Sequence, residues 1–248
     1  MSFVGLLPRH FSGHLPPFTV CFIGCFGVSA ISHLISERYL SATYEKLDKN
    51  QKLDWNAHTV SLIHSLLIAP AAGYALYKSP IALTDTLYGY DSLIGNIHAF
   101  SLGYFLWDAL HDVRTRQPVY LVHALVSFSA YLWTFRPVFM NIGPAFLLWE
   151  ASTPFVNINW FMDRIEGYKN SRSQIVNGIA LTLSFFTARI AFGGYMSYIF
   201  YKTIVEHQNS FPKSLAAVYV AGNITLNILN LNWFYKMMKK IKRMYSRL

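Results

Sequence analysis

The sequence predicts an all-α protein, a polytopic membrane helical bundle of about seven transmembrane helices. Three observations lead to this fold class. Hydrophobic residues make up 53% of the 248 residues, charged residues make up only 13%, and the apolar residues gather in long runs. A soluble globular chain carries about 25% charged residues. In lipid, a helix of about 20 apolar residues crosses the hydrocarbon core and satisfies its own backbone hydrogen bonds.

Seven apolar segments have the length of a transmembrane helix. They run over residues 16–36, 57–77, 93–112, 118–135, 138–162, 174–200 and 214–235. No long apolar run precedes the first segment, so we expect it to remain as a span rather than to be removed as a signal peptide. The fifth segment contains Pro144 and Pro154. We expect a kink or a break there, because proline cannot donate a backbone hydrogen bond.

The basic residues indicate how the bundle is oriented. The connections after the first, third and fifth segments, together with the C-terminal tail, carry 15 Lys and Arg residues, whereas the other side carries five. Cytoplasmic loops carry the excess of Lys and Arg, so we expect the C-terminus in the cytosol. The net charge of +9 comes from short clusters between apolar runs. This pattern favours contact with anionic lipid headgroups and disfavours nucleic-acid binding.

Ionisable residues inside the predicted spans are the first candidates for a functional site, because a charge in the bilayer core is costly. They are His33, His58, His64, His98, Asp108, His111, His123, Glu150 and Arg189, with Asn157 and Asn177 as uncharged partners. We expect His58 and His64, six residues apart, to form hydrogen bonds between helices. A buried pair such as Glu150 with Arg189 is equally compatible with a purely structural role.

Two of these residues are predicted to lie at the same depth. Asp108 is about one turn from the end of the third span, and His111 follows on the same helix face. His123 is five residues into the fourth span, which runs back from the same side. A carboxylate beside an imidazole raises its basicity, which suits a general base or an acyl-accepting nucleophile. We therefore expect His123 near Asp108, in a cavity in the cytosolic half of the bundle.

The stretch 147–161 is the most unusual part of the fifth segment. Glu150, two hydroxyl residues, a proline and two asparagines interrupt its apolar character. Such irregular polar helix is tolerated in a membrane where it lines a cavity or is buried against neighbouring helices. Glu150 and Asn157 are seven residues apart, so both are predicted to face the bundle interior.

Several short motifs resemble those of one known family. They are Asp54-Trp55-Asn56, Ser61-Leu62-Ile63-His64-Ser65, Gly103-Tyr104-Phe105-Leu106-Trp107-Asp108, His123, and Glu150-Ala151-Ser152-Thr153-Pro154-Phe155-Val156-Asn157 followed by Trp160-Phe161. In these motifs the chain resembles the TLC-domain family, which includes the ceramide synthases. The resemblance implies an N-terminal segment with the first transmembrane helix at 1–49, a TLC domain at 50–240 and a basic cytosolic tail at 241–248.

The resemblance also implies an endoplasmic-reticulum or endomembrane lipid protein whose helices surround a central, lipid-sized cavity for acyl chains. In ceramide synthases a His-His pair serves acyl transfer from acyl-CoA. Here that pair is His123-Ala124, and Asn159 replaces the usual Arg before the Trp-Phe pair. The candidate catalytic residues are His123 and Asp108. The candidate substrate-binding residues are Glu150, Asn157, His111 and Arg189.

Two functions remain open, and with them the question of whether the protein is an enzyme. The first is a lipid-homeostasis protein that binds or senses acyl chains and influences membrane lipid composition. The alternative is an acyl-CoA-dependent lipid acyltransferase that uses His123. Ala124 favours the first. A transporter is disfavoured because the spans show no repeated halves. We expect no metal and no cofactor, and acyl-CoA enters only as a possible substrate.

Overall fold

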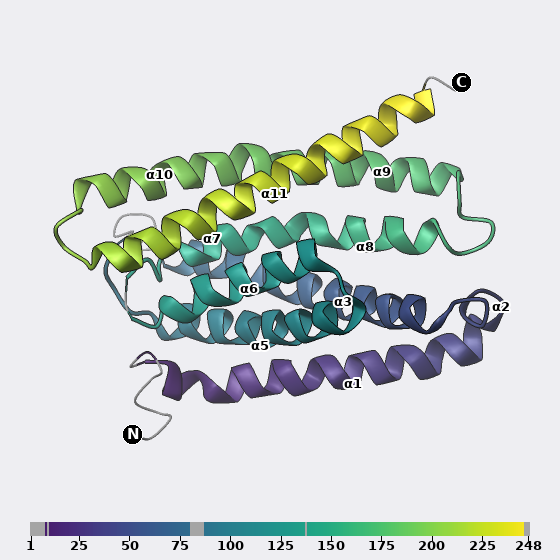
Figure 1. The fold of residues 1–248 in the computed structure, drawn as a ribbon, viewed down its shortest axis with the longest axis horizontal. Coiled ribbons are helices and arrows are strands. Elements are labelled where there is room, and N and C mark those ends of the chain that lie inside the picture. Colours follow the sequence, from purple (N-terminus) through teal and green to yellow (C-terminus); the bar gives the residue numbers. More distant parts are fainter. Residues whose placement is uncertain (1–7, 9, 80–86, 137, 246–248) are drawn as a thin grey trace.

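The computed structural model describes residues 8, 10–79, 87–136 and 138–245. Most of this described chain is helical, and its one β-type contact is an isolated bridge between Tyr88 and Val138. The long helices run side by side along one axis (Figure 1). Helix α1 (Leu15–Tyr39) begins at one end of the bundle and α11 (Lys213–Tyr245) ends at the opposite end. The predicted all-α membrane bundle is confirmed.

Each of the seven predicted segments corresponds to helix in the structure. Between α1 and α11 the described elements are α2 (Ser41–Tyr44), α3 (Lys49–Lys78), α5 (Ser92–Thr115), α6 (Pro118–Trp133), α7 (Gly143–Leu147), η3 (Leu148–Ser152), α8 (Thr153–Met162), α9 (Arg172–Phe185), η4 (Phe186–Phe192) and α10 (Gly193–Glu206), and η2 (Phe11–His14) precedes α1. Helix α3 begins with a capping box, in which Asp48 and Gln51 each accept a backbone hydrogen bond.

Four of the described helices are long and apolar enough to cross a membrane. They cover Phe11–Tyr39, Lys49–Lys78, Arg172–Glu206 and Lys213–Lys242, and α6 is a shorter apolar helix. Helix α5 is enclosed by α1, α3 and α6. Because protein rather than lipid surrounds it, α5 can carry the polar residues that the sequence places on it.

The fifth predicted span is broken, as the sequence predicted. It consists of α7, the short 3₁₀-helix η3 and α8, and residues 138–142 before α7 are not helical. Pro144 and Pro154 lie in the first turns of α7 and α8. A proline is tolerated there because the first backbone N–H groups of a helix have no partner inside it. The break places Glu150 on η3 and Asn157 on α8.

Helix α1 lies against α5 at a point where α5 has no side chain. A Cβ atom at Gly103 would meet the backbone oxygen of Phe18 and would lie 2.8 Å from the backbone nitrogen of Phe22. Cys21, on the same part of α1, is also small and buried. Small residues allow helix backbones to approach closely in membranes. Gly103 therefore sets the distance between α1 and α5.

Candidate functional site

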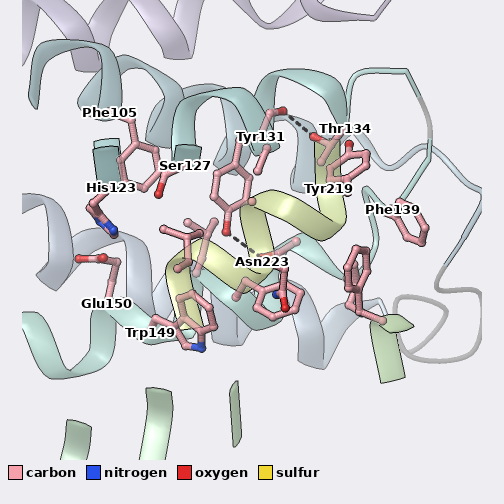
Figure 2. A pocket seen from close by; sticks show the side chains of 18 residues that line it. Phe105, His123, Ser127, Tyr131, Thr134, Phe139, Trp149, Glu150, Tyr219 and Asn223 are labelled. Atoms are coloured by element: carbon pink, nitrogen blue, oxygen red, sulfur yellow. Dashed lines mark hydrogen bonds between the residues drawn. The ribbon is translucent and has the colours of Figure 1, made fainter. Parts of the chain in front are cut away.

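A cavity of about 80 Å³ lies between α6 and α11 (Figure 2). On α6 it is lined by His123, Ser127 and Tyr131, which are four residues apart and so share one helix face. On α11 it is lined by Tyr219 and Asn223. Its other walls come from α5, from the segment before α7, and from α7, η3 and α10; they are mainly aromatic and aliphatic, including Phe105, Phe139, Ile142, Phe146, Leu147, Trp149 and Phe200.

His123 is placed at one end of this cavity. Its ring lies edge-on to Phe105 and to Trp233, with ring centroids 6.2 Å and 5.6 Å apart. Its Nδ1 atom is buried and has no hydrogen-bond partner. Figure 2 shows the carboxylate of Glu150 and the His123 ring turned toward one another, and no hydrogen bond joins them. A base and a carboxylate therefore face the same small volume inside the bundle.

Glu150 is paired with Arg189. The Nη2 atom of Arg189 lies 3.6 Å from Oε1 of Glu150, and both side chains are buried. The other guanidinium contacts are hydrogen bonds: Nε donates to Ser152 Oγ at 3.0 Å, Nη2 to Thr153 Oγ1 at 2.9 Å and Nη1 to Asn230 Oδ1 at 3.1 Å. Arg189 thus connects η3, α8 and α11. It lies on η4, a π-helical segment, a distortion that recurs at functional sites.

Asp108 does not form the predicted pair with His123. It is half-buried on α5, does not line the cavity, and no hydrogen bond or ion pair in the described part of the chain joins it to another side chain. The carboxylate that faces His123 is that of Glu150 (Figure 2). Helical rise sets the depth of a residue but not the side of the helix on which it lies, and the pairing rested on depth alone.

The cavity also extends beyond the half of the bundle in which we expected it. From His123 it runs away from Pro118 toward Phe139 and Tyr219, where α6 ends and α11 begins. The loop charges predict that end to be luminal, whereas the expected cavity was in the cytosolic half. The physical reason is the face of α6: Ser127 and Tyr131 continue it from His123 toward the helix end.

His111 and Asn157 belong to a different part of the bundle. His111 Nε2 lies 3.3 Å from an oxygen of Asp54 on α3. A hydrogen bond joins Asn157 Oδ1 to His58 Nδ1 at 2.6 Å, and Asn157 also donates to Ser61 at 3.1 Å. Neither His111 nor Asn157 lines the cavity. Both serve contacts between α3 and its neighbours.

The interior position predicted for Glu150 and Asn157 is confirmed, since both are buried. They contact different helices, Glu150 on the side of η4 and Asn157 on the side of α3. The hydrogen bonds expected between helices are confirmed for His58 and are absent for His64. Both ring nitrogens of His64 are buried without a partner, and the ring stacks on Tyr104 with centroids 3.9 Å apart.

Some lining residues were not among the candidates. The spacing of Ser127 and Tyr131 behind His123 was a usable signal, because four-residue steps on an apolar helix mark one face. Asn230, which holds the guanidinium of Arg189, had no comparable signal. Its role depends on a contact between two residues that are 41 positions apart in the chain and lie on different helices.

Comparisons with known proteins identify the same family that the sequence motifs resemble. The model of the TLC domain matches residues 54–239. An uncharacterized TLC domain-containing protein of Schizosaccharomyces pombe is 37% identical over 240 residues, which cover 96% of this chain and 80% of that protein. Topoisomerase I damage affected protein 4 of Saccharomyces cerevisiae is 33% identical over 204 residues, which cover 78% of this chain and 71% of that protein.

A vertebrate relative shows the same similarity. TLC domain-containing protein 4 of Homo sapiens is 28% identical over 218 residues, covering 84% of this chain and 82% of that protein. The match to the family model extends over more than half of the chain and includes the cavity, the Glu150–Arg189 pair and His123. The chain belongs to the TLC-domain family.

Proposed function

We propose that this protein binds acyl chains of membrane lipids in the cavity between α6 and α11, and that it thereby influences membrane lipid composition in the endoplasmic reticulum. The observation that carries the proposal is the amphipathic character of the cavity. One end holds His123 and Glu150, and the remaining walls are mainly aromatic and aliphatic. A lipid has the same division into a polar group and an apolar chain.

The volume of the cavity bears on how a chain would enter. At about 80 Å³ it is smaller than the ~150 Å³ apolar cavity that takes up one benzene molecule. An acyl chain therefore enters only as the lining side chains move apart. Aromatic walls suit this, because rings such as Phe105 and Phe146 turn without breaking hydrogen bonds.

A second candidate function is acyl transfer by His123. The observation that favours it is the unpartnered Nδ1 of His123 in a cavity that also holds a carboxylate. A neutral imidazole there could take the proton of a lipid hydroxyl or amine as that group attacks the thioester of acyl-CoA, and the thiol would leave with a proton. Ala124, in the place of a second histidine, is buried and offers no second base.

Lipid binding is tested on the full chain purified in detergent. The co-purifying lipids are extracted and identified by mass spectrometry. Ser127→Phe fills the cavity from α6 and is expected to weaken binding about tenfold, or ~1.4 kcal/mol. Leu125→Phe, on the exposed side of the same helix, is the control and should leave binding unchanged. Equal lipid content in both variants would contradict the proposal.

The two functions are separated by His123→Ala. In a strain that lacks this protein, acyl-chain binding without catalysis predicts that the variant restores the cellular lipid composition. Acyl transfer predicts that the variant still binds lipid after purification but fails to restore that composition.

A further inference from the structure

We propose that Phe139 closes the far end of the cavity and so sets the length of the acyl chain that the cavity accepts. This inference rests on the proposed function, because it assigns the direction and the stop of the bound chain. It adds a residue that the sequence did not single out. Three features of the structure carry it: the two ends of the cavity differ in polarity, aromatic rings close one end, and the backbone of Phe139 is held in an uncommon conformation.

The cavity has a polar end and a closed apolar end. Figure 2 shows His123 and Glu150 together at one end and Phe139 at the other, with Tyr131 and Asn223 between them. A chain that lies along the cavity therefore has one terminus near His123 and the other near Phe139.

The hydrogen bonds of the lining residues decide which terminus goes where. Toward the far end the hydroxyl groups already have partners: Tyr131 donates to Gly143 O at 3.2 Å, Thr134 to Tyr131 O at 2.7 Å and Tyr219 to Val138 O at 3.3 Å. The His123 ring lines the other end and has no hydrogen-bond partner among the described residues. A buried polar atom without a partner is costly, so the polar group of a ligand gains most at His123. The methyl end then points toward Phe139.

Aromatic rings close the end to which the methyl group points. The Phe139 ring is buried, with only 2% of the residue exposed. Its centroid lies 5.0 Å from that of Phe200 on α10, 5.3 Å from Tyr219 on α11 and 5.5 Å from Phe211 in the connection between these helices. All three contacts are edge-to-face, the favourable arrangement for aromatic pairs. Phe200 and Tyr219 line the cavity beside Phe139, and Phe211, which does not line it, packs against the same ring. These rings together close this end, and a chain cannot pass Phe139 in this conformation.

The backbone of Phe139 supports a specific role for its ring. Its φ angle is +64°, in the left-handed region that bulky residues rarely adopt. The neighbouring chain holds this conformation, because Phe139 N donates to Leu87 O at 2.9 Å. Glycine or asparagine fits such a position with less strain, and strain of this kind is concentrated at functional sites. The chain therefore places a large ring where a small residue would suit the backbone.

The test measures the acyl-chain lengths that the purified full-length protein retains. Wild type and variants are incubated with an equimolar series of phosphatidylcholines that differ only in chain length, purified again, and analysed by mass spectrometry. Phe139→Ala removes the stop, so the retained lipids should shift to longer chains. Phe139→Trp enlarges it, and the shift should be toward shorter chains. Opposite shifts from one position are not expected of a residue that only stabilises the fold.

Two further variants keep the test decisive. Phe200→Ala opens the same end from a regular helix and should also shift the lipids to longer chains, even if position 139 tolerates no change. Phe186→Ala, 48% exposed on η4, should leave the chain lengths unchanged. Wild type that retains no acyl lipid would contradict the proposed function itself. Wild type that retains lipid, with the same chain lengths in the Phe139 and Phe200 variants, would overturn the inference about Phe139 alone.

Discussion

Arg189 is a buried cation whose charge needs compensation inside the bundle. Its guanidinium has Glu150 as a counter-charge and hydrogen bonds to Ser152, Thr153 and Asn230. Arginine suits this position because its planar group presents five donors in a fixed geometry. The pair also holds the Glu150 carboxylate at the cavity end that His123 occupies.

We expect Glu150→Gln to destabilise the protein by about 3 kcal/mol, because removing one partner of a buried ion pair leaves the other charge uncompensated. The measurement is thermal or denaturant unfolding in detergent. Glu206→Gln is the control: Glu206 pairs with Lys202 at 3.7 Å, but both side chains are more than half exposed, and such pairs contribute little. A double variant, Glu150→Leu with Arg189→Met, should recover much of the loss. If it unfolds as easily as Glu150→Gln, the cost does not come from the unpaired charge.

At the residue scale the sequence located the important groups but not all of their partners. His123, Glu150 and Arg189 were recognisable because ionisable residues in apolar runs are few. The pairing of Glu150 with Arg189 was foreseen as a possibility, and the pairing of His123 with Asp108 was not found. A contact between side chains depends on the rotation of each helix about its axis, which the depth of a residue does not determine.

At the scale of elements, the approach of α1 to α5 and the break in the fifth span decide how the bundle packs. The break was predictable because its cause is local: a proline lacks a backbone donor wherever the chain goes. The close approach at Gly103 was not predicted, because its cause is a backbone more than 80 residues earlier in the sequence, at Phe18 and Phe22. Local causes can be read from sequence, and contacts between distant segments require the fold.

Gly103→Ala should destabilise the protein by ~1–3 kcal/mol, because overpacking against backbone atoms cannot be relieved by a side-chain rotation. Gly178→Ala is a matched control within helix α9. A Cβ atom there meets nothing within 4 Å, so the change should be neutral or should stabilise the helix by up to about 1 kcal/mol. Both are measured by unfolding in detergent. Equal stability of the two variants would show that α1 and α5 can separate without cost.

For the whole molecule, the arrangement of the helices supports an odd number of crossings. Helix α1 begins and α11 ends at opposite ends of the bundle (Figure 1). The distribution of Lys and Arg places 15 on one side and five on the other, which predicts a cytosolic C-terminus. The two observations are independent, because one comes from loop charge and the other from the path of the chain.

A glycosylation reporter tests this topology. Fused after Leu248, it should remain unmodified, because the cytosol lacks the glycosylation machinery of the lumen. The same reporter inserted between Glu206 and Lys213, in the connection from α10 to α11, should be modified. Modification at the C-terminus together with none in the connection would reverse the orientation. It would also place His123 and Glu150 at the opposite depth relative to the cytosol.

The sequence by itself determined the class of the protein, the position of its helices and the burial of Glu150 and Asn157. These follow from the length of apolar runs and from the cost of exposing polar groups to lipid, which are properties of composition and local order. Only the tertiary structure decided that Glu150 rather than Asp108 faces His123, and that Phe139 closes the cavity. Both contacts depend on how side chains from distant segments of the chain pack against one another. Protein interiors are packed as densely as crystals of small organic molecules, so only a few arrangements of these side chains are possible.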